Sequence, residues 1–251
     1  AWRRSDERHK KSVFQPLWSP TSELVVAEDS SGWWNLMLSN TFSQTSQSSS
    51  WVRPWPMKAE TAMPQWVYGM RTAAWAGNKL LAAICEKGRW TLHSLSKDGL
   101  VRKINQPFDD LQGLFAQSGR AVAIASNSLV GIGLLELDLS LGTWRHQPIT
   151  EPVLSEDQIS VAEPLWFEGY GGKSTHAWYY PPLKKDQSPA PLLVKSHSGP
   201  TGMAGRGLNL GIQFWTSRGW GVVDVNYGGS SGFGRAYRQR LEGGWGDVDV
   251  Y

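Results

Sequence analysis

The stretch VVDVNYGGSSGFGRAYRQRL, residues 222–241, decides how the C-terminal part of this sequence folds. It begins as an apolar run, passes through a glycine-rich turn and ends in a segment with helical spacing. Residues 228–232 match the pattern G-x-S-x-G, in which a serine between a strand and a helix acts as a nucleophile. Ser230 is therefore either a catalytic nucleophile or part of a structural turn, and the surrounding sequence has to distinguish the two.

The neighbouring segments predict an alternation of strands and helices. Residues 191–197, PLLVKSH, form a short apolar run that suits a buried strand, and residues 221–227 form a second one. Residues 208–220 have apolar side chains at helical spacing, with Gly219 placed to end the helix, and residues 234–244 predict another helix. Strand, helix, strand and helix at this spacing imply a βαβ unit in a mostly parallel sheet.

The first part of the chain has a different pattern. Residues 13–150 consist of short alternating runs separated by Gly, Asn, Asp and Ser clusters, which is typical of an all-β region. One plan, an aromatic residue followed by a turn, an apolar strand, a turn and a second strand, recurs in residues 17–40, 71–99 and 113–142. Its period of roughly 40–55 residues is that of the four-stranded blades of a propeller.

A polar connector, residues 146–164, separates this array from the C-terminal segments. After it, residues 164–182 predict a hairpin around Gly169–Gly172. Within the array, the polar stretch NTFSQTSQSSS, residues 40–50, is expected to be an exposed loop between strands.

Composition and charge exclude several classes of function. The 25 Lys and Arg against 22 Asp and Glu leave a net charge of +3, and the basic residues are scattered, so we expect no nucleic-acid partner. No apolar run reaches about 18 residues, so we expect no membrane span. The five histidines lack metal-ligand spacing, so no metal or cofactor is expected.

The single cysteine, Cys85, excludes an internal disulfide and favours a reducing, cytoplasmic location. We expect it to be a small buried residue. The sequence starts at Ala1 without a methionine and stops at Tyr251 inside a patterned segment, so we expect both ends to be cut.

Ten of the 15 tryptophans lie before residue 150. The pair Trp33-Trp34 suggests a platform for glycans or peptides, and a non-catalytic propeller that binds such ligands is one alternative function. Packing of large aromatic rings between neighbouring sheets is the favoured interpretation.

The order of residues along the chain argues against Ser230 as a nucleophile. In α/β-hydrolases the triad follows the order Ser, Asp or Glu, His. Asp247 and Asp249 follow Ser230, but the last histidine is His197, which precedes it. A serine without a base is a poor nucleophile, so we expect a structural turn, and a contact between Ser230 and an imidazole would contradict this expectation. We expect His197 to be a structural loop residue.

A phosphate-binding loop fits the same glycines poorly. Gly229 and Gly234 have the spacing of G-x-x-x-x-G-K-[ST], but Arg235 replaces the lysine and Ala236 replaces the hydroxyl residue that would bind magnesium. A tight turn whose glycines allow positive φ is the remaining interpretation.

A second loop, KSHSGPTG at residues 195–202, directly follows a predicted strand. Its small residues leave backbone N–H groups free to point into a cleft, as an oxyanion hole requires. An ordinary turn is the alternative on local evidence.

Two long stretches resemble a known family. LLVKSHSGPTG, residues 192–202, and residues 214–251 resemble the start of the catalytic domain of prolyl oligopeptidase-type serine peptidases, in the branch of acylaminoacyl-peptidases and dipeptidyl-peptidases. WSPTSELVVAEDSSGWWNL, residues 18–36, resembles a blade of their propeller. The resemblance implies a partial β-propeller over residues 1–158, followed by the N-terminal portion of an α/β-hydrolase domain over residues 159–251.

The resemblance further implies a hydrolase that cleaves short peptides through an acyl-enzyme. The triad Ser, Asp and His would lie beyond Tyr251, so the chain would be a fragment that is inactive alone. An oligomer remains open. An α/β-hydrolase esterase is another alternative, against which the propeller-like repeats argue.

Four residues can be compared with the family pattern. Gly199 matches the second glycine of the family's H-G-G-P loop, and this match implies that its amide is an oxyanion donor. Ser198 departs from the first glycine of that loop. Phe233 stands where some relatives have a tyrosine whose hydroxyl assists the oxyanion, so the Gly199 amide would matter more. Gly228 replaces the usual arginine, which leaves any salt bridge there in doubt.

Overall fold

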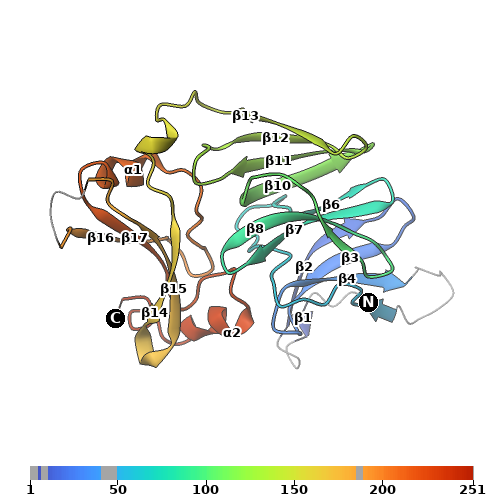
Figure 1. The fold of residues 1–251 in the computed structure, drawn as a ribbon. Coiled ribbons are helices and arrows are strands. Elements are labelled where there is room, and N and C mark those ends of the chain that lie inside the picture. Colours follow the sequence, from blue (N-terminus) through green and yellow to red (C-terminus); the bar gives the residue numbers. More distant parts are fainter. Residues whose placement is uncertain (1–4, 7–10, 41–49, 185–188, 251) are drawn as a thin grey trace. The chain divides into compact units, whose positions relative to one another are not determined.

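The computed structural model describes residues 5–6, 11–40, 50–184 and 189–250 (Figure 1). The chain divides into two compact units. Unit 1 comprises residues 1–125, 134–146 and 232–235, and unit 2 comprises residues 126–133, 147–231 and 236–251. The expected domain boundary near residue 158 stays a prediction.

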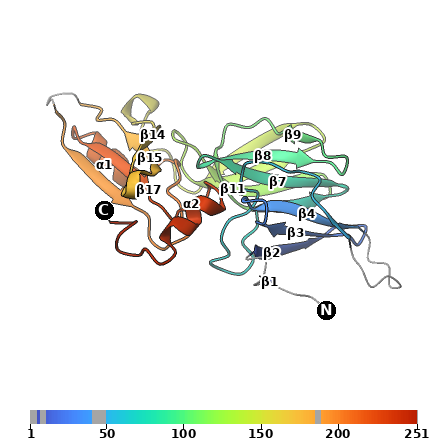
Figure 2. The same ribbon diagram turned by 90° about the horizontal axis from the view of Figure 1, so that it is seen from below.

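The described residues of unit 1 form three successive β-sheets (Figures 1 and 2). The first has the order β1 (Ser5–Asp6), β2 (Lys11–Trp18), β3 (Leu24–Glu28), β4 (Asn35–Asn40) and β5 (Ser50–Val52). The second has the order β6 (Ala73–Ala76), β7 (Lys79–Glu86), β8 (Arg89–Leu95) and β9 (Val101–Lys103). The third has the order β10 (Asp110–Gln117), β11 (Arg120–Ser126), β12 (Gly133–Asp138) and β13 (Thr143–Pro148).

The expected strand–turn–strand plan is present in all three repeated stretches. Residues 41–49, most of the expected polar loop, lie outside the described residues.

Two of the hairpins close with the same type of turn. Lys87 and Gly88 between β7 and β8, like Ser118 and Gly119 between β10 and β11, all have positive φ. Positive φ at both central residues defines the type I′ turn, whose twist matches that of the strands it joins.

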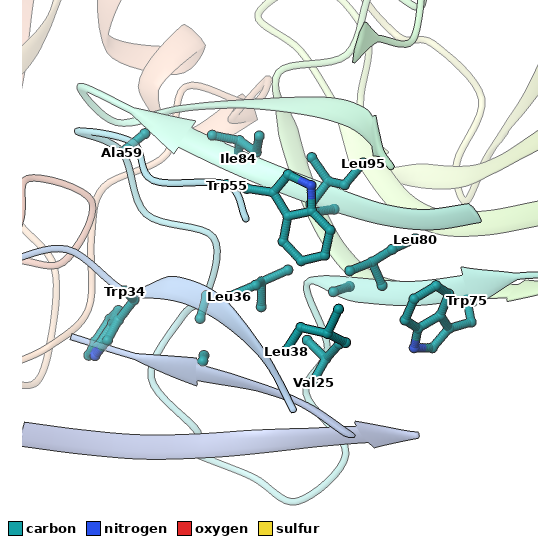
Figure 3. Packing of buried hydrophobic residues seen from close by; sticks show 14 residues of the cluster. Val25, Trp34, Leu36, Leu38, Trp55, Ala59, Trp75, Leu80, Ile84 and Leu95 are labelled. Carbon is teal, nitrogen blue, oxygen red and sulfur yellow. The ribbon is translucent and has the colours of Figure 1, made fainter. Parts of the chain in front are cut away.

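One hydrophobic cluster of unit 1 lies between the first and second sheets (Figure 3). Alternate residues along each strand point into it, as the two-residue period of a strand requires. Trp55 lies among them, 1% exposed, and its indole Nε1 donates to the Ser96 carbonyl oxygen at 2.7 Å. The members labelled in Figure 3 are Val25, Trp34, Leu36, Leu38, Trp55, Ala59, Trp75, Leu80, Ile84 and Leu95.

Two buried groups of unit 1 are chemically distinctive. Cys85 on β7 is fully buried, as expected, and burial together with the nearby Glu60 carboxylate raises the pKa of its thiol well above the usual value. Glu60 is itself buried. Its carboxylate accepts hydrogen bonds from the amides of Trp34 at 2.6 Å and Gly234 at 3.1 Å, so residues 232–235 are bonded to the interior of unit 1.

Unit 2 contains one sheet of order β14 (Glu163–Glu168), β15 (Ser174–Tyr180), β17 (Gly221–Asn226) and β16 (Leu192–Ser196). The expected hairpin forms from β14 and β15, with a short 3₁₀ helix at Tyr170–Gly172 in its turn. The expectation of a mostly parallel sheet is wrong. β15 is antiparallel to both of its neighbours, and β16 and β17 alone run parallel among the described strands of this sheet.

The βαβ unit itself is present, because helix α1 (Leu210–Thr216) connects β16 to β17. The side chain of Asn209 caps the helix by accepting from the Ile212 amide at 3.2 Å, and Gly219 turns the chain with a φ of +85°. The second helix is shorter than expected. It consists of α2 (Arg235–Arg238) and a 3₁₀ turn at Gln239–Leu241.

β17 is buried as expected, but β16 is not. Leu192 and Val194 are 52% and 66% exposed. Within the described residues β16 pairs with β17 and with no second strand, so one of its edges has no neighbour. Among all the residues that the structure describes, no helix combines the length and apolar character needed to cross a membrane.

Candidate functional site

Two loops of unit 2 meet at one edge of its sheet. Residues 197–202 follow β16, and residues 227–231 follow β17. Because the two strands are parallel neighbours, with Ser196 paired to Val225, their C-terminal ends deliver both loops to the same place. Loops at the carboxyl ends of parallel strands are the usual position of binding and catalytic residues in α/β sheets.

Hydrogen bonds join the two loops. The hydroxyl of Tyr227 donates to the Gly199 carbonyl oxygen at 2.5 Å, and the Ser231 amide donates to the Gly202 carbonyl oxygen at 2.9 Å. The ring of His197 stacks on that of Tyr227, with centroids 4.5 Å apart and planes inclined by 19°. The two loops therefore form one structural element.

An imidazole does reach Ser230. His197 Nε2 lies 2.7 Å from Ser230 Oγ, which contradicts the expectation that this serine has no histidine partner. Order along the chain excludes only histidines that follow Ser230, whereas the parallel pairing of β16 with β17 places an earlier residue beside it. The question of the nucleophile therefore rests on geometry rather than on residue order.

The geometry of Ser230 is that of a structural residue. It is 0% exposed, whereas an elbow serine presents its Oγ at the surface. Its Oγ lies 2.8 Å from the Tyr227 carbonyl oxygen, which can only accept, so the single hydroxyl proton has a partner in its own turn. Gly229 and Gly232 in the turn around it have positive φ values, whereas Ser230 does not.

His197 also lacks the partner that a catalytic base needs. Its Nδ1 faces the Ser198 carbonyl oxygen at 3.3 Å rather than a carboxylate. In a triad a carboxylate at Nδ1 orients the imidazole and stabilises its charged form. Here burial lowers the pKa of His197 and Lys195 acts in the same direction, while the Ser198 carbonyl oxygen and the Asp224 carboxylate oppose that change. The pair thus lacks the features that activate a serine.

An ion pair between a buried aspartate and an exposed lysine lies beside this site and was not anticipated. Asp224 on β17 and Lys195 on β16 are paired in the sheet register. The carboxylate of Asp224 accepts a hydrogen bond from Lys195 Nζ at 2.5 Å. Burial raises the pKa of Asp224, and Lys195 opposes that rise. The Oδ1 atom has no hydrogen-bond partner within the described residues. The signal in the sequence was a charged residue inside the apolar run VVDV.

Gly199 has the properties that an oxyanion donor requires. It is exposed, its φ of +74° lies in the left-handed region, and its amide has no acceptor among the described residues. The role itself stays a prediction. Neighbouring Ser198 is exposed too. Phe233 belongs to unit 1 and is half-buried.

The structure explains why position 228 has no side chain. A Cβ on Gly228 would lie 2.6 Å from Val248 Cγ1 and 3.2 Å from Arg240 Cβ. The Arg240 guanidinium stacks on the Tyr237 ring, 4.0 Å from its centroid, and donates to the Ser174 carbonyl oxygen at 2.8 Å. The space beside residue 228 is therefore already filled.

Other expected features can be located as well. Trp34 is buried and makes an edge-to-face contact with Phe14 at 5.3 Å, so its ring packs inside unit 1 and is not an exposed platform. Among the described residues, no group of His, Cys, Asp and Glu side chains has the arrangement of a metal site.

Comparisons with known proteins give relatives of one kind. No family model matches the sequence. Dipeptidyl-peptidase 5 of Trichophyton equinum is 29% identical over 138 residues, which cover 53% of this chain and 19% of that protein. Dipeptidyl-peptidase 4 of Giardia intestinalis is 32% identical over 94 residues, 36% of this chain and 12% of that protein.

Solved structures match over nearly the whole chain. A puromycin-hydrolysing peptidase of Mycobacterium tuberculosis gives a TM-score of 0.88 at 29% identity, and a puromycin hydrolase gives 0.86 at 32% identity. Both alignments cover 96% of this chain, but 38% and 37% of those proteins. A prolyl endopeptidase structure, 14% identical with a TM-score of 0.63, shows a shared fold alone.

Proposed function

We propose that the chain is part of a serine peptidase acting on short peptides. Its homologues are dipeptidyl-peptidases and puromycin-hydrolysing peptidases, which confirms the resemblance to the prolyl oligopeptidase family. The observation that carries this proposal is the alignment of 96% of the chain with a puromycin-hydrolysing peptidase at a TM-score of 0.88. The mostly β-sheet fold matches the propeller domain of such enzymes.

The finer assignment of the domains is part of the proposal. Residues 1–158 would supply blades of a β-propeller, and residues 159–251 would begin an α/β-hydrolase domain. The successive sheets of unit 1 support the first assignment. The β16–α1–β17 unit, with its two joined loops, supports the second.

The proposed chemistry is acyl transfer from a peptide to a serine. The Gly199 amide would donate to the oxyanion that forms when the scissile carbonyl is attacked, and loss of one such donor costs about 10²–10³ in rate. We place the nucleophile, acid and base outside residues 1–251, because Ser230 is buried and its hydroxyl is bonded within its turn. A cytoplasmic location remains part of the proposal.

Three measurements test the proposal. A fluorophosphonate probe, which reacts with activated serines, should leave the purified 251-residue chain unlabelled, and the chain should not hydrolyse aminoacyl chromogenic substrates. Labelling of Ser230 that disappears in Ser230→Ala would overturn the assignment of the nucleophile. Sequencing of the adjoining coding region should find a G-x-S-x-G-G motif followed by Asp and His, and a stop codon directly after Tyr251 would contradict the proposed peptidase.

A further inference from the structure

We propose that Tyr227, His197 and Ser230 are positioning residues that together form a latch, which holds residues 197–202 in the conformation that turns the Gly199 amide outward. The importance of that amide rests on the proposed function. The latch itself rests on the contacts of these three side chains, and its test needs no enzymatic activity.

Tyr227 is the centre of the latch. It is buried, directly follows β17 and directs its hydroxyl at the preceding loop. The hydroxyl donates to the Gly199 carbonyl oxygen at 2.5 Å and lies 3.3 Å from the His197 carbonyl oxygen. Because the carbonyl of Gly199 is held toward the protein, the left-handed backbone at this residue leaves its amide without an internal acceptor.

His197 fastens the start of the same loop. Its ring is held between the Tyr227 ring, on which it stacks, and the Ser230 hydroxyl. The loop wraps closely around it, because a Cβ at Gly202 would lie 2.9 Å from His197 Nδ1 and 3.1 Å from the Ser198 carbonyl oxygen. A glycine at position 202 is therefore required by the imidazole that it encloses.

The hydrogen bonds assign the direction of the His197–Ser230 contact. If Nε2 carries the proton, it donates to Ser230 Oγ at 2.7 Å, and the hydroxyl donates to the Tyr227 carbonyl oxygen at 2.8 Å. The other tautomer would leave two oxygens 2.8 Å apart without a proton between them. It would gain only the longer contact of 3.3 Å from Nδ1 to the Ser198 carbonyl oxygen. The Nε2–H tautomer therefore fits the two short distances.

This assignment is the opposite of that in a nucleophile–base pair. A catalytic base accepts the serine proton at Nε2 and carries its own proton at Nδ1. In the latch, the imidazole donates to the serine, and the serine donates to the backbone. The position of one proton therefore distinguishes the structural contact of His197 with Ser230 from a catalytic pair with the same heavy-atom distance.

The wild-type chain provides the first test, by NMR of the protein labelled with ¹⁵N-histidine. The five histidines give few signals, and the His197→Gln variant identifies the one that matters. We expect the neutral His197 ring to be the Nε2–H tautomer, and Ser230→Ala to change its ¹⁵N shifts. A neutral Nδ1–H tautomer would overturn the latch.

The second test measures how firmly the loop is held. Tyr227→Phe retains the stacked ring and removes only the hydroxyl, so hydrogen exchange of peptides covering residues 197–202 should accelerate about five- to tenfold, the effect expected for loss of one hydrogen bond. Tyr170→Phe, at a half-exposed ring on the β14–β15 turn, is the matched control and should leave that exchange unchanged.

Exchange in Tyr227→Phe equal to that of the wild type would overturn the proposal. Neither readout depends on turnover, so failure of the latch would leave the assignment to a peptidase family intact. Conversely, the proposed function could fail in its own tests while the tautomer and exchange results stand.

Discussion

The hydrophobic cluster of unit 1 and the sheet of unit 2 are packed with different chemistry, although unit 1 also buries polar side chains such as Glu60 outside that cluster. The cluster between the first two sheets of unit 1 consists of aliphatic and indole side chains in strict alternation along the strands. In unit 2 the sheet buries His176, Asp224 and Asn226 close to the apolar Trp178 and Val222. An apolar interior needs only the right periodicity, whereas each buried polar group needs a specific partner. The cluster of unit 1 should therefore respond mainly to lost volume, and the buried polar groups of the unit 2 sheet to pH and to the loss of single hydrogen bonds.

Strands β7 and β16 sharpen the comparison, because both are apolar runs in the sequence. β7 is buried along its whole middle, whereas β16 is largely exposed. β7 has a paired strand on each side, while β16 pairs with β17 alone among the described strands. Apolar sequence thus predicts a strand, but its neighbours determine how much of it is buried.

The largest expected effect separates these two strands. Leu80→Ala on β7 removes a fully buried side chain and should lower the free energy of unfolding by about 2–5 kcal/mol. Leu192→Ala on β16 makes the same chemical change at a side chain that is 52% exposed, and should cost within about 0.5 kcal/mol. Urea unfolding followed by tryptophan fluorescence measures both. Equal losses in the two variants would remove the distinction between the strands.

The next effect concerns pH and belongs to unit 2. Burial lowers the pKa of His176 from 6.5 to about 4, so the folded state binds the proton less readily than the unfolded state. Stability is therefore complete above pH 6.5 and falls as the pH drops toward 4, by on the order of 2–3 kcal/mol at the lower end.

His176→Phe provides the comparison for this prediction. It removes the titrating group and retains a ring between Trp166 and Trp178, both of which make edge-to-face contacts with His176. Urea unfolding between pH 7.5 and pH 4.5 should show a smaller loss of stability in the variant than in the wild type. Identical pH profiles would show that this histidine does not control the acid stability of unit 2.

The smallest effect tests the packing around the glycine-rich turn. Gly228→Ala places a Cβ 2.6 Å from Val248 Cγ1 and should cost about 1–3 kcal/mol through overpacking. Gly131→Ala is the matched control, because its Cβ meets no atom within 4 Å and its φ is not positive. Combining Gly228→Ala with Val248→Ala should recover most of the loss in a thermal melt. No recovery would mean that the clash lies elsewhere.

Features set by a few consecutive residues were predictable from the sequence. The strand pairs of the three repeats and the hairpin around Gly169–Gly172 follow from alternation and from turn residues, both of which are local. The helix that follows Asn209 was predicted for the same reason. The antiparallel pairing of β15 with β17 was missed, because strands far apart in the sequence do not encode their relative direction locally.

The candidate site divides in the same way. The loop that contains Gly199 was singled out by its small residues and its place after a strand, and its role as an oxyanion donor stays a prediction. Its partner Tyr227 was not, because one tyrosine after an apolar run carries no signal of the carbonyl oxygen that it binds. The contact of His197 with Ser230 was excluded on the basis of order along the chain, which parallel pairing makes irrelevant.

The burial of Cys85 makes its thiol a chemical reporter of opening in unit 1. A thiol that is fully enclosed, with its pKa raised, reacts with disulfide reagents only when the structure around β7 opens. It is the one cysteine in the 251 residues, so each modification event reports an opening of unit 1 and of nothing else. Its rate of modification, set beside amide exchange in unit 2, would reveal which half of the chain opens first.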